Sequence, residues 1–236
     1  MSTLETGQPK HQGNYDIVLA LFCGLLLISN IGATKLIAFG PDFSLGGYQL
    51  LPILTDGGAI LFPMTYILGD VLAEVFGLKK ANRAIFTAFA LSVLMSLTFF
   101  IVDLAPTAGD WDLKDSWHAV LGFVPRIVIA SLLAYLAGQL LNALVLVRIR
   151  DRWGERRLWV RLISSTVVGE FADTVIFGLV AFGPVGAILD GESIGFDALL
   201  NYVVAGWIYK VLVEVALLPV TYNVIKAIKK RESPTL

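Results

Sequence analysis

The stretch from Pro63 to Gly77 reads PMTYILGDVLAEVFG and carries two carboxylates, Asp70 and Glu74, within an otherwise apolar segment. At a spacing of four residues, Tyr66, Asp70 and Glu74 share one face of a helix. A carboxylate at the centre of a membrane helix costs about 2.5–3.5 kcal/mol, so such residues usually face a cavity, a partner or a ligand. The stretch therefore predicts a membrane helix with a functional polar face.

The composition supports a polytopic membrane protein. Of 236 residues, 56% are hydrophobic and only 16% are charged, and the mean hydropathy is +0.75. A helix needs roughly 20 apolar residues to cross the hydrocarbon core. We expect an all-α integral membrane protein with six transmembrane helices near residues 15–39, 57–77, 81–102, 119–147, 158–182 and 198–224. We expect a disordered polar tail at 1–14, a transmembrane domain at 15–226 and a basic tail at 227–236.

Basic residues gather beside three of these segments and set the expected orientation. They are Lys79, Lys80 and Arg83, six arginines between Arg148 and Arg161, and Lys226, Lys229, Lys230 and Arg231 near the end of the chain. The positive-inside rule places both termini and the Arg-rich loop in the cytoplasm. The same loop has the composition of a lipid- or nucleic-acid-binding patch. We favour a topology determinant and expect no nucleic-acid partner.

A second acidic motif lies about a hundred residues after the first. STVVGEFAD (165–173) aligns with TYILGDVLAE (65–74) when one residue is omitted. Helical spacing puts Thr166, Glu170 and Asp173 on one face. With three spans in each half, this repeat is compatible with two inverted three-helix halves around a midplane polar cavity, an arrangement common in transporters. Chance recurrence of a short motif is the alternative.

The sixth expected span contributes Trp207, Lys210 and Glu214. Lys210 and Glu214 lie one turn apart, so a pair within their own helix competes with a role in ligand binding. In the first span, Asn30 and Lys35 bound a polar interruption, and we weigh a substrate or ion-pair role for Lys35.

Other polar and small residues receive structural interpretations. We expect Arg126, beside Pro125, to extend outward to the membrane interface. Pro63, Pro125 and Pro219 are candidates for bending their helices. A stripe of small residues, Ala130, Ala134 and Gly138, predicts close helix packing or a homodimer face.

Within the expected spans, acidic residues outnumber basic residues. This excess of carboxylates suits a ligand with adjacent N–H donors. A carboxylate has two oxygens that accept such donors in parallel, as on a guanine-like edge. Tyr66 and Trp207 offer stacking faces. The lone Cys23 and the two histidines, which lie outside the spans, provide no metal site or disulfide, and no Gly-x4-Gly-Lys phosphate loop is present. We expect no cofactor.

Three motifs together resemble the queuosine precursor transporter family, also called the vitamin uptake transporter family. They are NIGATK (30–35), the 63–77 stretch and STVVGEFADT (165–174). The resemblance covers residues 15–226 and implies import of a 7-deazaguanine across a bacterial inner membrane for queuosine modification of tRNA. The implied substrates are the cyano form, the aminomethyl form and queuine. The substrate-binding candidates are Asn30, Lys35, Tyr66, Asp70, Glu74, Glu170, Asp173, Trp207, Lys210 and Glu214.

Two other classes compete with secondary or facilitated transport. One is the substrate-binding membrane component of a vitamin importer that needs a separate ATPase. The other is an intramembrane enzyme, because paired acids can activate water. Aspartyl proteases of the presenilin type need Gly-x-Gly-Asp, and the run ending at Asp70 has Ile67 in the first position. We therefore expect no enzymatic activity.

Overall fold

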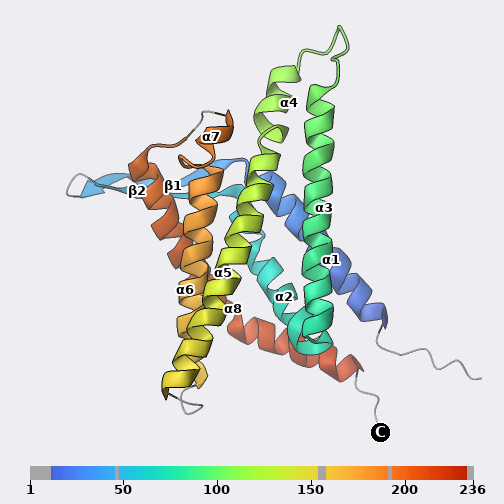
Figure 1. The fold of residues 1–236 in the computed structure, drawn as a ribbon, viewed down its shortest axis with the longest axis vertical. Coiled ribbons are helices and arrows are strands. Elements are labelled where there is room, and N and C mark those ends of the chain that lie inside the picture. The colour runs from blue at the N-terminus through green and yellow to red at the C-terminus, as the bar shows by residue number, and fades with distance from the viewer. Residues whose placement is uncertain (1–11, 46–47, 154–157, 191–192, 233–236) are drawn as a thin grey trace, which may run out of the picture.

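The computed structural model describes residues 12–45, 48–153, 158–190 and 193–232, and it is mainly helical (Figure 1). The long helices are α1 (Gln12–Gly32), α3 (Leu78–Leu104), α5 (Val124–Trp153), α6 (Leu158–Ala181) and α8 (Phe196–Glu232). The shorter elements are strands β1 (Leu36–Leu45) and β2 (Tyr48–Asp56), the 3₁₀ turn η1 (Gly57–Ile60) and helices α2 (Phe62–Phe76), α4 (Lys114–Leu121) and α7 (Ala187–Asp190).

The hairpin β1–β2 corrects two expectations, the all-α fold and a first span that reaches residue 39. The helix ends at Gly32, where the Thr34 hydroxyl donates to the carbonyl of Ile31 at 2.8 Å. Phe39 then pairs with Ile53, and Ile37 with Thr55, in an antiparallel ladder. A short apolar run does not distinguish a strand from a helix by its periodicity, so the expected extension of the first helix to residue 39 is wrong.

Glycines let η1 approach the end of α1 closely. A Cβ atom on Gly57 would lie 2.5 Å from the carbonyl oxygen of Gly32, and one on Gly58 would lie 2.7 Å from that of Ser29. The Ser29 hydroxyl also donates to the carbonyl of Gly58 at 3.0 Å. The hairpin is thereby held against the end of α1.

The prolines of α2 and α5 begin their helices and do not bend them. Pro63 lies in the first turn of α2, and Pro125 is the second residue of α5. Proline is tolerated there because the first turn leaves its N–H groups unpaired in any case. Pro219 alone of the three lies inside a helix, α8.

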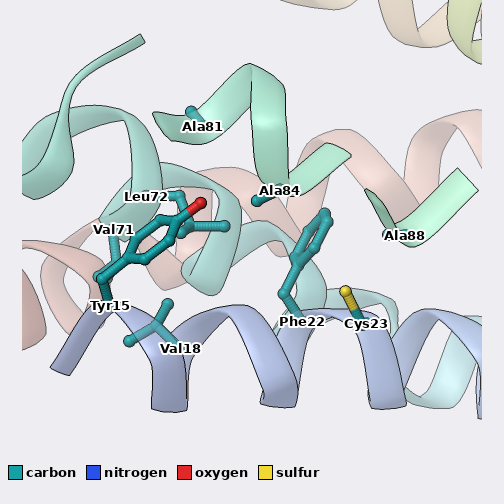
Figure 2. Packing of buried hydrophobic residues seen from close by; sticks show 9 residues of the cluster. All are labelled: Tyr15, Val18, Phe22, Cys23, Val71, Leu72, Ala81, Ala84 and Ala88. Atoms are coloured by element: carbon teal, nitrogen blue, oxygen red, sulfur yellow. The ribbon is translucent and has the colours of Figure 1, made fainter. Parts of the chain in front are cut away.

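One apolar core joins α1, α2 and α3 (Figure 2). Val71 and Leu72 of α2 are buried in this core beside Tyr15 of α1, and Ala84 of α3 belongs to the same cluster. The distal part of α8 packs against this core with Val224, Ile225 and Ile228, which are partly buried. Helices from both ends of the sequence therefore share one core.

The second half of the bundle depends on small residues. The stripe Ala130, Ala134 and Gly138 of α5 is buried, and a Cβ atom on Gly138 would lie 3.1 Å from the carbonyl oxygen of Gly169 on α6. Small residues let helix backbones approach closely in membranes. The stripe packs within the chain, as one of its two interpretations predicted.

Among the described residues, four helical stretches are long and apolar enough to cross a membrane. They are Asn14–Gly32, Leu78–Leu104, Phe196–Ile228 and Lys114–Leu141, the last of which runs through α4 into α5. Helix α2 has 15 residues, which is about 22 Å of helix and short of the roughly 30 Å hydrocarbon core. The count of six spans and the inverted halves therefore stay predictions.

Candidate functional site

The middle of α6 carries the two carboxylates of the second acidic motif. Glu170 lies about 17 Å from either end of this helix at the usual rise per residue. Helix α2 approaches with Tyr66 and helix α8 with Lys210, and both contact these carboxylates. We call Tyr66, Glu170, Asp173 and Lys210 the polar cluster.

The polar cluster is joined by hydrogen bonds and ion pairs between three helices. Tyr66 donates its hydroxyl hydrogen to Glu170 Oε1, and Lys210 Nζ pairs with Asp173 Oδ2. Lys210 Nζ also lies 3.7 Å from Glu170 Oε2. The side chains of Lys210, Glu170 and Asp173 are 17%, 13% and 25% exposed. Charges this well removed from solvent need partners, and here α6 and α8 supply them to each other.

Lys210 therefore finds carboxylate partners on another helix, whereas one interpretation of the sequence paired it with Glu214 on its own. Glu214 lies one turn further along α8 and interacts electrostatically with Glu170 and Asp70. Asp70 in turn interacts with Glu74, and both side chains are exposed on α2. Glu214 and Asp70 thus add negative charge near the polar cluster.

Sequence comparison identifies the family. The chain matches the family described as "Putative vitamin uptake transporter" over residues 56–224. The chain belongs to this transporter family. It is 30% identical over 188 residues to the "Probable queuosine precursor transporter" of Bacillus subtilis (strain 168), covering 78% of this chain and 77% of the relative.

A second relative, the "Queuosine precursor transporter" of Escherichia coli (strain K12), is 31% identical over 134 residues, which is 57% of this chain and 58% of the relative. No solved structure matches. The family resemblance inferred from the three sequence motifs is confirmed. This vitamin uptake transporter family member is a membrane transporter of a small molecule and not an enzyme.

In this transporter, Trp207 connects helices. Its indole N–H donates to the carbonyl of Val167 on α6 at 3.1 Å, and its ring forms a T-shaped contact with that of Phe171, with centroids 5.4 Å apart. Phe171 is 46% exposed. The contacts of Trp207 thus fix α8 to α6 beside the polar cluster.

Two further candidates lie in structural positions. Asn30 is buried, donates to Ser92 of α3 at 3.2 Å and accepts from Ser131 of α5 at 3.2 Å. Interhelical bonds of this kind are common in membrane proteins. Lys35 is exposed in the turn after α1, and its carbonyl accepts from the N–H of Gly57 at 2.8 Å. Within the described residues, neither Asn30 nor Lys35 contacts the polar cluster.

The expectation that Arg126 extends to the membrane interface is wrong. Its side chain is 4% exposed and donates to the carbonyls of Val180 at 3.0 Å and Gly183 at 3.2 Å. The last carbonyls of a helix lack partners within it and favour a cation. Arg126 therefore caps the end of α6 from α5.

Sequence reasoning missed a group of polar contacts between the hairpin and α8. Tyr202 donates to Asp56 Oδ2 at 2.6 Å, and Asp56 Oδ1 accepts from the N–H of Gly58 at 2.9 Å. Asn201 accepts from the N–H of Leu54 at 2.9 Å and donates to the carbonyl of Pro52 at 3.1 Å. Asn201 thus provides hydrogen-bond partners for two backbone groups on the edge of β2 that faces α8. The signal available in the sequence was an Asn-Tyr pair in the first turns of an apolar helix.

Within the part of the chain that the structure describes, no group of three His, Cys, Asp or Glu side chains is arranged to hold a metal ion. The polar cluster instead presents one cation, two carboxylates and a phenol from three helices. Its chemistry is that of hydrogen bonding to a polar organic solute.

Proposed function

We propose that this transporter imports precursors of queuosine across a bacterial inner membrane and thereby supplies tRNA modification. The substrates are 7-deazaguanines, namely the cyano form, the aminomethyl form or queuine. Both relatives described above carry queuosine precursor transport in their names. Transport is secondary or facilitated, and residues 15–226 form the transporting domain.

The orientation with both termini in the cytoplasm is part of the proposal. The start of α3, the end of α5 and the end of α8 lie at the lower end in Figure 1, and all three segments are basic in sequence. Helix α4, the hairpin and α7 lie toward the opposite end. The positive-inside rule assigns the lower end to the cytoplasm.

The polar cluster is the observation that carries the substrate assignment. Glu170 is nearly buried midway along α6 and uses Oε1 to accept from Tyr66. Its second oxygen and those of Asp173 suit the adjacent N–H donors of a guanine-like edge, because carboxylates accept parallel hydrogen bonds. Lys210 suits the ring carbonyl. Glu214 and Asp70 add negative charge close to this site.

The test uses bacteria that neither make nor import the precursors, because tRNA queuosine then reports uptake directly. Cells expressing the chain are fed each precursor at low concentration, and the queuosine content of their tRNA is measured. We expect wild type to restore the queuosine content of tRNA. The Glu170→Gln variant should restore at least tenfold less queuosine. Asp112→Asn, in an exposed loop, is the matched control and should behave as wild type.

Three results would contradict the whole proposal or a part of it. Failure of well-expressed wild type to restore queuosine with any precursor would point to another solute. Restoration only when a separate ATPase is co-expressed would favour the multi-subunit importer. Full activity of Glu170→Gln would remove the polar cluster from the substrate path while leaving import intact.

A further inference from the structure

Lys210 supplies positive charge to both carboxylates of α6. Its Nζ pairs with Asp173 and lies 3.7 Å from Glu170 Oε2. All three side chains are largely buried, so solvent screens them little. The charge of Lys210 is thus part of the electrostatic field in which any ligand of this site binds.

The two carboxylate oxygens of Glu170 have different surroundings. Its Oε1 accepts from Tyr66, whereas its Oε2 is buried and has no hydrogen-bond donor among the described residues. The distance of 3.7 Å to Lys210 is that of an ion pair and exceeds the range of an N–H···O hydrogen bond. Oε2 therefore has a cation nearby but lacks a donor.

We propose that Lys210 is a specificity-determining residue, which shifts the site toward uncharged ligands that offer adjacent N–H donors and away from analogues that carry an added ammonium. This inference rests on the proposed function. A neutral N–H group supplies the hydrogen bond that Oε2 lacks without adding charge. An ammonium elsewhere on the ligand brings a second positive charge close to Lys210.

The distances make this repulsion effective. A bicyclic ring system is no wider than the Debye length of about 8 Å at physiological ionic strength, and burial weakens screening further. An ammonium on such a ligand therefore interacts with Lys210 wherever it is attached. When the lysine charge is removed, Glu170 and Asp173 no longer have that cation beside them. The same ammonium on a ligand then binds more favourably.

The experiment measures a ratio of substrates, which expression level and partial misfolding do not change. Uptake of the aminomethyl-deazaguanine, a cation, is divided by uptake of the uncharged cyano form in the same cells. We expect Lys210→Met to raise this ratio about tenfold, Asp173→Asn to lower it about tenfold and Lys210→Arg to leave it unchanged. The double variant Lys210→Met with Asp173→Asn removes one charge of each sign and should return close to wild type.

Each result has a definite meaning. An unchanged ratio in an active Lys210→Met or Asp173→Asn variant would overturn the inference while leaving the proposed function intact. Loss of both substrates in both single variants, with normal uptake in the double variant, would make the pair purely structural and also overturn it. Uptake of neither compound by wild type would instead remove the proposed function on which the inference rests.

Discussion

Tyr66 on α2 donates a hydrogen bond to Glu170 on α6, so the tyrosine of the first acidic motif contacts the carboxylate of the second. The two motifs are about a hundred residues apart in sequence and meet in the middle of the bundle. Lys210 of α8 then joins the same carboxylate from a third helix. Three helices are held together by groups that are costly to leave unpaired in a membrane.

Removing the Tyr66 hydroxyl should weaken transport. A hydrogen bond to a charged group contributes about 1.5–3 kcal/mol, so we expect Tyr66→Phe to lower uptake by roughly tenfold or more. Tyr135→Phe is the matched control, because Tyr135 packs edge-on against Phe89 of α3, with centroids 4.9 Å apart. Equal uptake by the two variants would show that the Tyr66 hydroxyl is dispensable.

The ion pair between α6 and α8 should show strong coupling in stability. Removing one member of a buried pair typically costs 3–5 kcal/mol, whereas replacing both is often nearly neutral. We expect Lys210→Met to lower the apparent Tm in detergent and the added change Asp173→Asn to recover most of the loss. A double-mutant cycle with additive effects would argue against a direct interaction.

Packing of α5 on α6 should make Gly138 sensitive to size. Its added Cβ would lie 3.1 Å from the carbonyl oxygen of Gly169 and 3.2 Å from Asp173 Cβ, whereas Gly24 has nothing within 4 Å of its added Cβ. Alanine favours a helix by about 1 kcal/mol over glycine. We expect Gly24→Ala to be neutral or stabilising and Gly138→Val to lower the apparent Tm. Similar melting temperatures would show that α5 and α6 adjust freely.

The cap that Arg126 forms on α6 predicts a loss of stability that an interfacial arginine would not show. Arg126→Met removes donors to two buried carbonyls, each of which costs about 1–3 kcal/mol when left unsatisfied. We expect a clear fall in apparent Tm, while Arg83→Met, at an exposed position of α3, should change little. Hydrogen exchange at residues 180–186 provides a local readout, and unaltered protection there would contradict the cap.

The hairpin should depend on Asn201, which satisfies the edge of β2 from α8. We expect Asn201→Leu to increase proteolytic cleavage within residues 36–56, because Leu54 and Pro52 then lose their partners. Asn223→Leu, at an exposed position of the same helix, is the control. A hairpin that resists protease equally in both variants would assign its stability to the strand ladder alone.

Helical spacing predicted part of the site because it concerned single helices. Glu170 and Asp173 were placed on one face, and that face does meet Lys210. Asp70 and Glu74 followed the same rule, yet their side chains are exposed on α2. Spacing states which residues share a face but not which neighbour that face meets.

The remaining differences come from tertiary contacts and from strand pairing. The closeness of Arg126 to a loop predicts an interfacial side chain, but the carbonyls that bind it lie at and just beyond the end of α6, more than fifty residues away. Asn30 stays a candidate for substrate binding, and its side chain pairs with Ser92 and Ser131 in this structure. A polar residue in an apolar run identifies a need for a partner without identifying the partner.

Helices α2 and α3 are connected by Gly77 alone, which has φ 84°, a value that favours glycine. Because a connection of one residue is too short to absorb a movement, a tilt of α2 as a rigid body must displace the first turn of α3. That turn carries Lys80, whose carbonyl accepts from the Tyr15 hydroxyl at 3.1 Å and whose ammonium lies 5.1 Å from the Tyr15 ring centroid. Tyr15 at the start of α1 is therefore mechanically coupled to Tyr66 in the middle of the bundle, and a fluorophore or spin label near Tyr15 can follow its movement.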